Sequence, residues 1–562
     1  MKLIMRTIKY LTGIAAAFIA IGCGEDFLDS KNLYEKLDVD YYSTPAEISE
    51  ALTGVYSCLP LNEGVNNPLL VAELLSDDRL GGGGSDNSDD FQAMDAFVPG
   101  EQDLFLPLWK KNYEGIFRAN MILKRFDQAV YTSDAEKNQA KGEACFLRAF
   151  FYFRLAQFFG TVPLILDPAP VNYPRASAEE LFGQIASDLK TAIEIMPDKR
   201  FENLSKDWLG HATKWAAEGL MARVFLFYTG YYEKSELPLA GGESVTKAQV
   251  TAWIDDCVNN SGHGLIPDFR NLWPYTFSND AYPSQYPYVV NNDLKWVGED
   301  GANNETVFTI KYSPYGNWNA PGKLSYSSQL VLYMGLRSKN YFPFGRGWGA
   351  GPVNPQLWES FETGDIRQQG SILNLIDTIA DEGAINREFV WGADQQHQET
   401  GYWQKKYMPV TVKVGAELRG MYYVILSEPS DFQLWNMQDE VLIRFADILL
   451  MGAELGSPNA QDYLDRIRTR AKLASVAPTL ENIKRERRHE LAFEGLRYFD
   501  LLRWHDAEAA FAVVNNIPVK NIGIDEIYSV TYRPVTGGFL PIPESEISLS
   551  NYVLKQNPGW EQ

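Results

Sequence analysis

Apolar residues recur at three- and four-residue steps along much of this chain, which is the spacing of one helix face. The clearest run lies between residues 108 and 159 and predicts two helices. Pro45, placed ahead of another apolar run, predicts an earlier helix that ends near Tyr56. The same period returns at 178–196, 212–227, 439–454, 460–473 and 480–504. Recurring Ala- and Leu-rich pairs predict a degenerate tetratricopeptide-like array, mainly within 45–227 and 439–504.

The helical period is lost over a long central region, about residues 262–438, in which Pro, Gly, Asn, Tyr and Trp are frequent. Within it, only 305–312 alternates like a strand. A second irregular stretch, the Gly- and Asp-rich 81–90, predicts a loop. The many rings of the central region argue against disorder. We therefore expect a mostly α fold: tetratricopeptide-like helix pairs packed against a loop-rich, aromatic-rich lobe with few short strands.

The first residues carry an export pattern. A basic segment with Lys2, Arg6 and Lys9 precedes an apolar stretch that ends in Ala20-Ile21-Gly22-Cys23. This predicts a signal peptide over 1–22, because the apolar stretch is shorter than the ~20 residues of a spanning helix. The ending resembles a lipobox, which makes Cys23 the acylated first residue of a single body over 23–562. The alternative is an ordinary signal peptide with a coincidental cysteine.

Charge and cysteine content exclude several classes of protein. Removing Lys2, Arg6 and Lys9 takes the formal net charge from −22 to −25. Such an acidic body repels phosphate backbones, so we expect no nucleic-acid partner. The other cysteines, Cys58, Cys145 and Cys257, lack paired spacing and are predicted to be buried free thiols.

Motifs for catalysis are missing. The five histidines form no His-Glu-x-x-His, and neither a Gly-x-Ser-x-Gly elbow nor a phosphate-binding Gly-rich loop is present. Gly345 to Gly351 lacks the strand and helix that a dinucleotide site needs. The acidic run Asp86–Asp90 departs from the EF-hand pattern, because Phe91 stands where Gly is needed. We expect no enzyme and no cofactor and assign no metal ligands, while a structural ion near this acidic run stays open.

The C-terminal third carries the resemblance that decides the class. The stretch Arg487-Arg488-His489-Glu490-Leu491-Ala492-Phe493-Glu494-Gly495-Leu496-Arg497-Tyr498-Phe499-Asp500-Leu501-Leu502-Arg503-Trp504 resembles the SusD/RagB family, as do Leu540-Pro541-Ile542-Pro543 and Gln556-Asn557-Pro558-Gly559. Upstream, 142–149 and 443–450 also look like family segments, so the resemblance spans the chain. It implies a helical outer-membrane lipoprotein that caps a SusC/RagA-like TonB-dependent barrel transporter.

The charges of that stretch have a structural interpretation. On one continuous helix, Glu490, Glu494, Arg497, Asp500 and Arg503 are three or four residues apart and pair along one face. We expect a buried or interface ion network that orients neighbouring helices, and no catalytic role.

Ligand contacts are expected in the loop-rich region, because sugars need flat rings for their C–H faces and planar polar groups for their hydroxyls. The segment with Tyr315, Asn317, Trp318 and Asn319 is the leading candidate. The competing interpretation for each ring is that it packs the loops onto the helices. Further candidates for glycan binding are Trp273, Tyr275, Tyr286, Tyr288, Trp296, Trp348 and Arg346, then Asp78 with Arg79, and last Arg367.

The expected function is capture of an oligosaccharide at the cell surface of a Gram-negative bacterium and its delivery to the barrel transporter, as part of polysaccharide utilization. The lipid anchor would hold the protein on the outer membrane. Two alternatives stay open: a RagB-like peptide-binding lipoprotein, and a structural lid of the transporter.

Overall fold

The computed structural model describes residues 41–61, 65–85, 88–98, 100, 103–169, 171–299, 301–313, 327–376, 388–427, 431–434 and 436–561. The predicted signal peptide, Cys23, Asp86, and the segment with Tyr315, Asn317, Trp318 and Asn319 lie outside the described residues.

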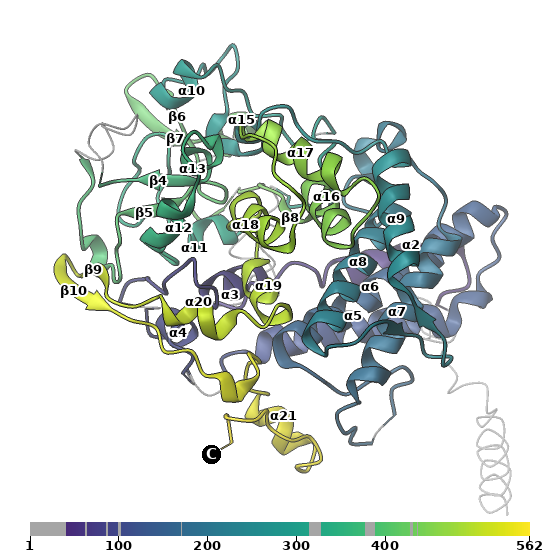
Figure 1. Cartoon of the computed structure of the whole chain (residues 1–562). Helices are drawn as coiled ribbons and strands as arrows, with labels where there is room; N and C mark the ends of the chain where they lie inside the picture. Colours follow the sequence, from purple (N-terminus) through teal and green to yellow (C-terminus); the bar gives the residue numbers. More distant parts are fainter. Residues whose placement is uncertain are drawn as a thin grey trace, which may run out of the picture.

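Long helices make up one side of the molecule, on the right in Figure 1. They are α2 (Pro45–Tyr56), α5 (Leu106–Arg125), α6 (Asp134–Phe159), α7 (Ala178–Ile195), α8 (Lys214–Tyr231) and α9 (Lys247–Asn260). From α5 to α9 each helix packs against the next one in the chain. The helices predicted over 45–56, 108–159, 178–196 and 212–227 are therefore confirmed. We call this set, together with α16 to α18 below, the helical half.

Local sequence signals set where these helices begin and how closely they pack. Thr44 and Ser177 each form a capping box with a glutamate three residues on, at the start of α2 and α7. On α5, a Cβ at Gly115 would lie 2.4 Å from the Phe151 ring of α6. Glycine is therefore needed at that crossing, because the facing ring fills the space of a side chain.

The last helices depart from the prediction in two places. The stretch predicted as a helix over 439–454 begins as strand β8 (Glu440–Arg444) and continues as α16 (Phe445–Glu454). Strand β8 pairs antiparallel with β3 (Thr306–Ile310), which confirms the predicted strand in that region. The helical period was wrong for 440–444 because pairing with a distant strand outweighs local preference.

The second departure is a break in the predicted helix over 480–504. After α17 (Ala460–Arg470) the chain forms α18 (Leu480–Glu490), an irregular link, and α19 (Arg497–Arg503). Phe493 and Gly495 have φ of 68° and 72°, so the backbone leaves the right-handed helix there. A Cβ at Gly495 would lie 3.2 Å from Leu69, which shows how closely the link approaches α3 (Pro68–Leu74).

Short elements make up the other side, the loop-rich half, on the left in Figure 1. Its helices are α10 (Pro287–Asn291), α11 (Leu330–Tyr333), α12 (Pro355–Ser360), α13 (Ile366–Ser371) and α15 (Met421–Leu426). Its strands form two antiparallel pairs, β4 (Ile372–Asn374) with β5 (Tyr402–Gln404) and β6 (Thr411–Val414) with β7 (Glu417–Gly420). Each element is held by its neighbours in space, because none is long enough to be stable alone.

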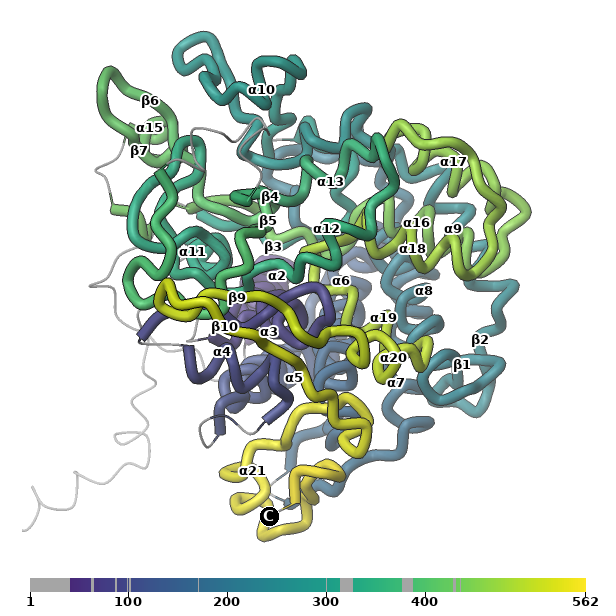
Figure 2. The backbone as a smooth tube through the Cα atoms, turned by 60° about the vertical axis from the view of Figure 1, so that its left-hand side comes forward, coloured from purple at the N-terminus to yellow at the C-terminus, as the bar shows by residue number. Residues whose placement is uncertain are grey.

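Further elements belong to neither set. They are α3 (Pro68–Leu74), α4 (Ser88–Asp95), β1 (Leu237–Pro238), β2 (Ser244–Val245), α20 (Ala507–Ala512), β9 (Ile517–Asn521), β10 (Ile524–Tyr528) and α21 (Glu544–Leu549). Helix α4 corrects the prediction of a loop through residue 90, since it begins at Ser88. The hairpin β9–β10 reaches the loop-rich half, as the turned view of Figure 2 shows, and Glu399 and Lys520 exchange backbone hydrogen bonds of 3.0 and 2.8 Å.

The fold is mostly helical with few short strands, as predicted. Cys58, Cys145 and Cys257 are buried free thiols, also as predicted. Throughout the described ranges, every helix is too short or too polar to cross a bilayer.

Candidate functional site

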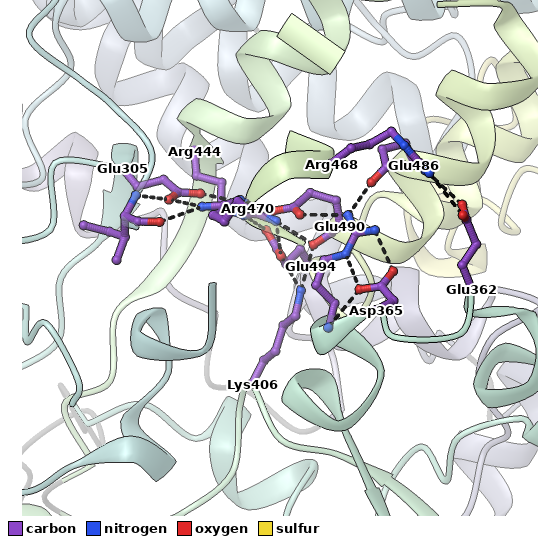
Figure 3. A network of polar contacts seen from close by, with 12 residues as sticks. Glu305, Glu362, Asp365, Lys406, Arg444, Arg468, Arg470, Glu486, Glu490 and Glu494 are labelled. Carbon is purple, nitrogen blue, oxygen red and sulfur yellow. Dashed lines mark hydrogen bonds and ion pairs between the residues drawn. The ribbon is translucent and has the colours of Figure 1, made fainter. Parts of the chain in front are cut away.

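A cluster of buried charges lies where the two halves meet, and Figure 3 shows it from close by. Arg444, at the end of β8, places its guanidinium 2.8 Å from Glu305, 2.6 Å from Glu490 and 2.6 Å from Glu494. Arg470, at the end of α17, binds Glu305 and Glu490 at 2.5 Å each. We call these residues, with the partners in the next paragraph, the central ion cluster.

The loop-rich half supplies the other cations of this cluster. Arg367, on α13, contacts Glu490 at 3.1 Å, Glu486 at 2.5 Å and Asp365 at 2.7 Å. Lys406 binds Glu494 at 2.6 Å. Burial lowers the pKa of Lys406 to about 8, although Glu494 acts in the opposite direction. The cluster thus ties loop segments to α17 and α18 through charges that water does not reach.

A second group of ion pairs surrounds α19. Arg487 contacts Asp447 at 2.7 Å and Asp500 at 2.8 Å, and Arg503 contacts Glu454 at 2.5 Å. These pairs connect α16 and α18 of the helical half to α19. The expected ion network that orients neighbouring helices is therefore present.

The prediction that these charges pair with one another along one helix face was wrong for most of them. Asp500 and Arg503, both on α19, do pair at 2.8 Å. Glu490, Glu494 and Arg497 bind partners on other elements, because the chain leaves the helix between α18 and α19. Arg497 forms its ion pair with Asp77, which lies more than four hundred residues earlier in the chain.

Asp78 and Arg79, expected at a ligand edge, are buried and have structural partners. Asp78 accepts hydrogen bonds from the Arg488 guanidinium at 2.9 and 2.5 Å. Arg79 is 1% exposed and lies against the Phe493 ring, with its carbon centre 5.1 Å from the ring centroid. Their predicted place in a ligand site is corrected, since burial leaves no face for a ligand. Arg367, the weakest candidate, is fully buried in the central ion cluster and is corrected in the same way.

Four of the predicted loop rings belong to the core. Trp273 is 3% exposed, and Tyr275, Tyr286 and Tyr288 are equally buried. The buried Lys405 ammonium lies 4.4 Å from the Tyr288 centroid and near the other two tyrosine rings. These rings pack the loops around a cation, so the interpretation as packing rings holds for them and the prediction of ligand contact is corrected.

Trp296 is half-buried and lies beside half-buried Phe277 and buried Tyr422. Its centroid lies 6.3 Å from that of Phe277 and 6.4 Å from that of Tyr422. Phe277 also lines a small cleft, together with Tyr282, Gln285, Phe342 and Lys413. The cleft lies between the segment before α10 and the hairpin β6–β7, at the upper left of Figure 1. We call it the Phe277 cleft.

Arg346 and Trp348 follow Phe342 in the same irregular stretch of the chain. Trp348 is half-buried and meets Tyr333 edge-on, with centroids 4.7 Å apart. Arg346 is exposed, and its guanidinium lies 4.7 Å above the Phe432 ring. This arrangement presents a ring and a planar cation on one irregular segment.

Ser327, the first described residue after the leading candidate segment, is held by hydrogen bonds with Asn436. The Ser327 hydroxyl donates to the Asn436 carbonyl at 3.2 Å, and the Asn436 amide donates to the Phe432 carbonyl at 3.4 Å. The Arg346 guanidinium lies over the Phe432 ring, and Asn436, the partner of Ser327, also contacts Phe432. Ser327 and Arg346 are therefore both tied to the segment around Phe432.

Three ring positions of the cleft were not predicted: Phe277, Tyr282 and Phe342. Each lies in the Pro- and Tyr-rich region of the sequence, but no period separates these half-exposed rings from the buried ones nearby. Rings with a free face and planar or charged neighbours can stack on an apolar ligand surface and fix hydroxyl groups. Among the described residues no cluster of three or more metal-binding side chains occurs.

Comparisons with known proteins agree across most of the chain. Residues 26–226 match the family model described as "Starch-binding associating with outer membrane", and residues 300–560 match the model of the SusD family. The SusD-like protein P2 of Formosa agariphila is 22% identical over 98% of this chain and 100% of its own length.

Two solved structures share the fold over nearly their whole length. The surface glycan-binding protein A from Bacteroides fluxus is 25% identical, with a TM-score of 0.71, covering 92% of this chain and 100% of its own. A laminarin binding SusD-like protein is 26% identical with a TM-score of 0.71 and the same coverage.

Proposed function

We propose a function that starts from one premise: this chain belongs to the SusD/RagB family. From it we infer a cell-surface protein that binds an oligosaccharide without chemical change and hands it to a SusC-like TonB-dependent transporter. A lipid on Cys23 would hold the protein on the outer membrane. Two solved relatives that cover equal shares of this chain are named for binding a glycan and laminarin. These names support a glucan as the first ligand class.

The observation that carries this proposal is the set of half-exposed rings on irregular segments of the loop-rich half. Trp296, Phe277 and Trp348 are each only partly buried, while the adjacent loops are fixed by buried tyrosines and ions. A rigid framework with a few free rings suits binding, because little conformational entropy is lost when the ligand arrives. We propose Tyr315, Asn317, Trp318 and Asn319 as further ligand contacts from their residue types alone, because they lie outside the described residues.

The absence of turnover is part of the proposal. The charged residues of the family stretch are buried in ion pairs, where they hold elements together. A glycosidase needs two carboxyl groups on either side of a bound sugar, at about 5–10 Å. Phe277, Trp296, Trp348 and Arg346, which we call the ring surface, offer rings and a cation, which suit recognition.

Isothermal titration of the mature protein against laminarihexaose and a panel of other oligosaccharides tests the ligand. We expect heat with at least one glycan and no released product. Changing Trp318 or Tyr315 to Ala should weaken binding at least about tenfold, which is ~1.4 kcal/mol. Trp296→Ala and Trp348→Ala should each weaken it to a smaller degree.

A ring on the opposite half provides the matched control. Phe117, on α5, is 50% exposed, so Phe117→Ala removes a surface ring without touching the loop-rich half. Its affinity should equal that of the wild type. Heat with peptides but with no glycan would replace this proposal by the peptide-binding alternative.

Two further measurements address the anchor and the partner. Mass spectrometry of the protein from membranes should find an acylated Cys23 as the first residue. Purification from detergent-solubilised outer membranes should recover a barrel transporter in stoichiometric amount. Recovery of the transporter with no ligand binding by any glycan or peptide would favour the structural lid.

A further inference from the structure

A groove near the C-terminus lies on a different part of the molecule from the rings described above. Its volume is about 550 Å³, within the range of sites that hold small ligands or short peptide segments. Phe105, Arg533 and Trp560 line it together with three acidic residues, Asp103, Glu544 and Glu561. In Figures 1 and 2 the neighbouring helix α21 lies at the bottom, whereas α10, β6 and β7 lie at the top. We call it the C-terminal groove.

The cation of this groove is already engaged. The Arg533 guanidinium donates to the Phe97 carbonyl at 3.1 Å and to the Gly559 carbonyl. It also lies over the Trp560 ring, 4.4 Å from the centroid. Arg533 therefore builds the wall of the groove and has little capacity left for an anion.

The other polar donors of the wall are engaged too. The Gln556 amide donates to the Ile542 carbonyl at 2.8 Å and accepts from the Ile542 N–H at 2.7 Å. The Trp560 indole N–H donates to the Phe539 carbonyl at 2.8 Å. Pro541 and Pro543 have no N–H to offer. A saccharide, which needs donors as well as acceptors, is poorly matched by such a wall.

The carboxylates keep acceptor capacity. Asp103 accepts the Ser545 N–H at 3.2 Å, and Glu561 accepts the Gly559 N–H at 2.9 Å. A carboxylate has about four acceptor positions, so most of them remain. Within the described part of the chain, no Lys or Arg forms an ion pair with Asp103, Glu544 or Glu561. The groove is thus acceptor-rich and negatively charged.

Exposed apolar side chains lie on the chain segments that carry the lining residues, and we call them the apolar rim. Val535, Leu549 and Tyr552 are all more than half exposed, and a Cβ at Gly559 would lie 2.7 Å from Val535. Asn551 and Tyr552 are both in the left-handed region, with φ of 52° and 61°. A bulky residue in that region is strained, so the turn after α21 presents the Tyr552 ring to solvent at a cost in free energy. Exposed aromatic groups beside a groove are typical of a protein interface.

We propose that the C-terminal groove docks an extended, Lys- or Arg-bearing segment of a partner protein, with the apolar rim covering its flanks. Charge complementarity selects a basic segment, because the free groups of the wall are carboxylates. The two family segments Leu540–Pro543 and Gln556–Gly559 thereby acquire a role, since both contribute to this wall. This inference concerns a face separate from the ring surface and does not depend on glycan binding.

Fluorescence anisotropy with two labelled, blocked peptides tests it on the full mature protein. One peptide has the sequence Gly-Lys-Leu-Lys-Pro-Gly, and the other has glutamate in place of both lysines. We expect the lysine peptide to bind at least tenfold more tightly, and its affinity to fall as salt is raised. In the double variant Glu544→Gln/Glu561→Gln the affinity should fall at least fivefold, and in Tyr552→Ala at least twofold.

A matched control is Glu481→Gln, which removes an exposed carboxylate from the first turn of α18 and should leave peptide affinity unchanged. Equal unfolding midpoints for wild type and variants would exclude loss of folding as the cause. Equal affinity for the two peptides, binding of neither, or unchanged affinity in the double variant would each overturn the proposal. Displacement of the lysine peptide by laminarihexaose would overturn it as well, in favour of a second sugar site.

Discussion

In the helical half, Trp215 is buried on α8, 1% exposed, and its indole N–H donates to the Lys199 carbonyl at 2.7 Å. In the loop-rich half, Trp273 is buried almost as deeply in an irregular turn, but its indole N–H has no hydrogen-bond partner among the described residues. Its ring packs against Tyr407 and the Lys406 ammonium, with centroid distances of 5.9 and 4.8 Å. The two halves bury rings equally well by different means.

This difference shows what holds loops in place when they have no regular hydrogen-bonded ladder. Helices satisfy their own backbone and need only apolar faces to pack. Loops need side chains to satisfy polar groups, and here Arg, Lys and carboxylates do so in the central ion cluster. The ring surface can therefore rest on a rigid base without being helical itself.

The largest effect is expected from breaking the central ion cluster. Arg444→Ala leaves the carboxylates of Glu305, Glu490 and Glu494 buried with fewer partners. Removing one partner from a buried ion network costs about 3–5 kcal/mol, so urea unfolding should show a loss of that size.

The control for this prediction is Arg466→Ala on α17, whose guanidinium lies 4.0 Å from Asp462 in a largely exposed pair. Exposed pairs contribute about 0–1 kcal/mol, so this variant should stay close to wild type. Similar losses for both variants would mean that the buried cluster does not join the two halves.

Much of this could be predicted from the sequence, because the relevant signals are local. The period of apolar residues identified α2 and α5 to α8, and the start signal at Pro45 placed the first of them correctly. The strand Thr306–Ile310 was recognised by its alternation, whereas its partner β8 was hidden in a helix-like period. The break after Glu490 was also hidden, since Phe493 gives no sign of its left-handed backbone.

The site was harder to predict than the fold. Trp273 and Trp296 lie in the same aromatic region, yet one is buried beside Lys406 and the other is half exposed beside Phe277. Burial in loops depends on contacts between residues far apart in sequence, such as Asp78 with Arg488, and these contacts leave no period. Composition therefore located the aromatic region but could not sort its rings.

A second prediction compares the two buried tryptophans directly. Trp215→Ala and Trp273→Ala should each cost about 3–5 kcal/mol in urea unfolding, because each deletes a large buried side chain. A much smaller loss for Trp273→Ala would show that the loop-rich half is not packed as a core.

The phenylalanine variants sharpen this comparison. Trp215→Phe should cost ~1 kcal/mol more than Trp273→Phe, since only Trp215 loses a hydrogen bond and leaves the Lys199 carbonyl without its donor. Equal losses would indicate that the indole N–H of Trp273 is satisfied by water.

A third prediction uses pH at the junction between α9 and the loop-rich half. His263 is buried against Phe201, and burial lowers its pKa to about 4, although the Asn304 carbonyl and Glu202 oppose the shift. The neutral ring is therefore favoured in the folded state, so its contribution to stability is complete above pH 6.5 and is lost as pH falls toward 4. That loss amounts to ~3 kcal/mol.

Buried acids shift in the opposite direction, since burial raises the pKa of Glu73, Asp95 and Glu399 to about 7. Their effect on stability cancels when wild type is compared with a variant at the same pH. The difference in unfolding free energy between wild type and His263→Gln should shrink by ~3 kcal/mol from pH 7 to pH 4. A constant difference would mean that the pKa of His263 is the same in the folded and unfolded states.

The smallest effect concerns a helix start, where the helical half depends on local signals alone. The Ser177 hydroxyl accepts the Glu180 N–H at 3.1 Å, and the Glu180 carboxylate accepts the Ser177 N–H at 2.8 Å. Ser177→Ala should cost ~1 kcal/mol in urea unfolding, whereas Ser177→Gly should cost only a few tenths, because glycine is tolerated at this position. Glycan affinity should be unchanged in both, since α7 lies in the helical half. A change in affinity would show that the helical half does more than support the ring surface.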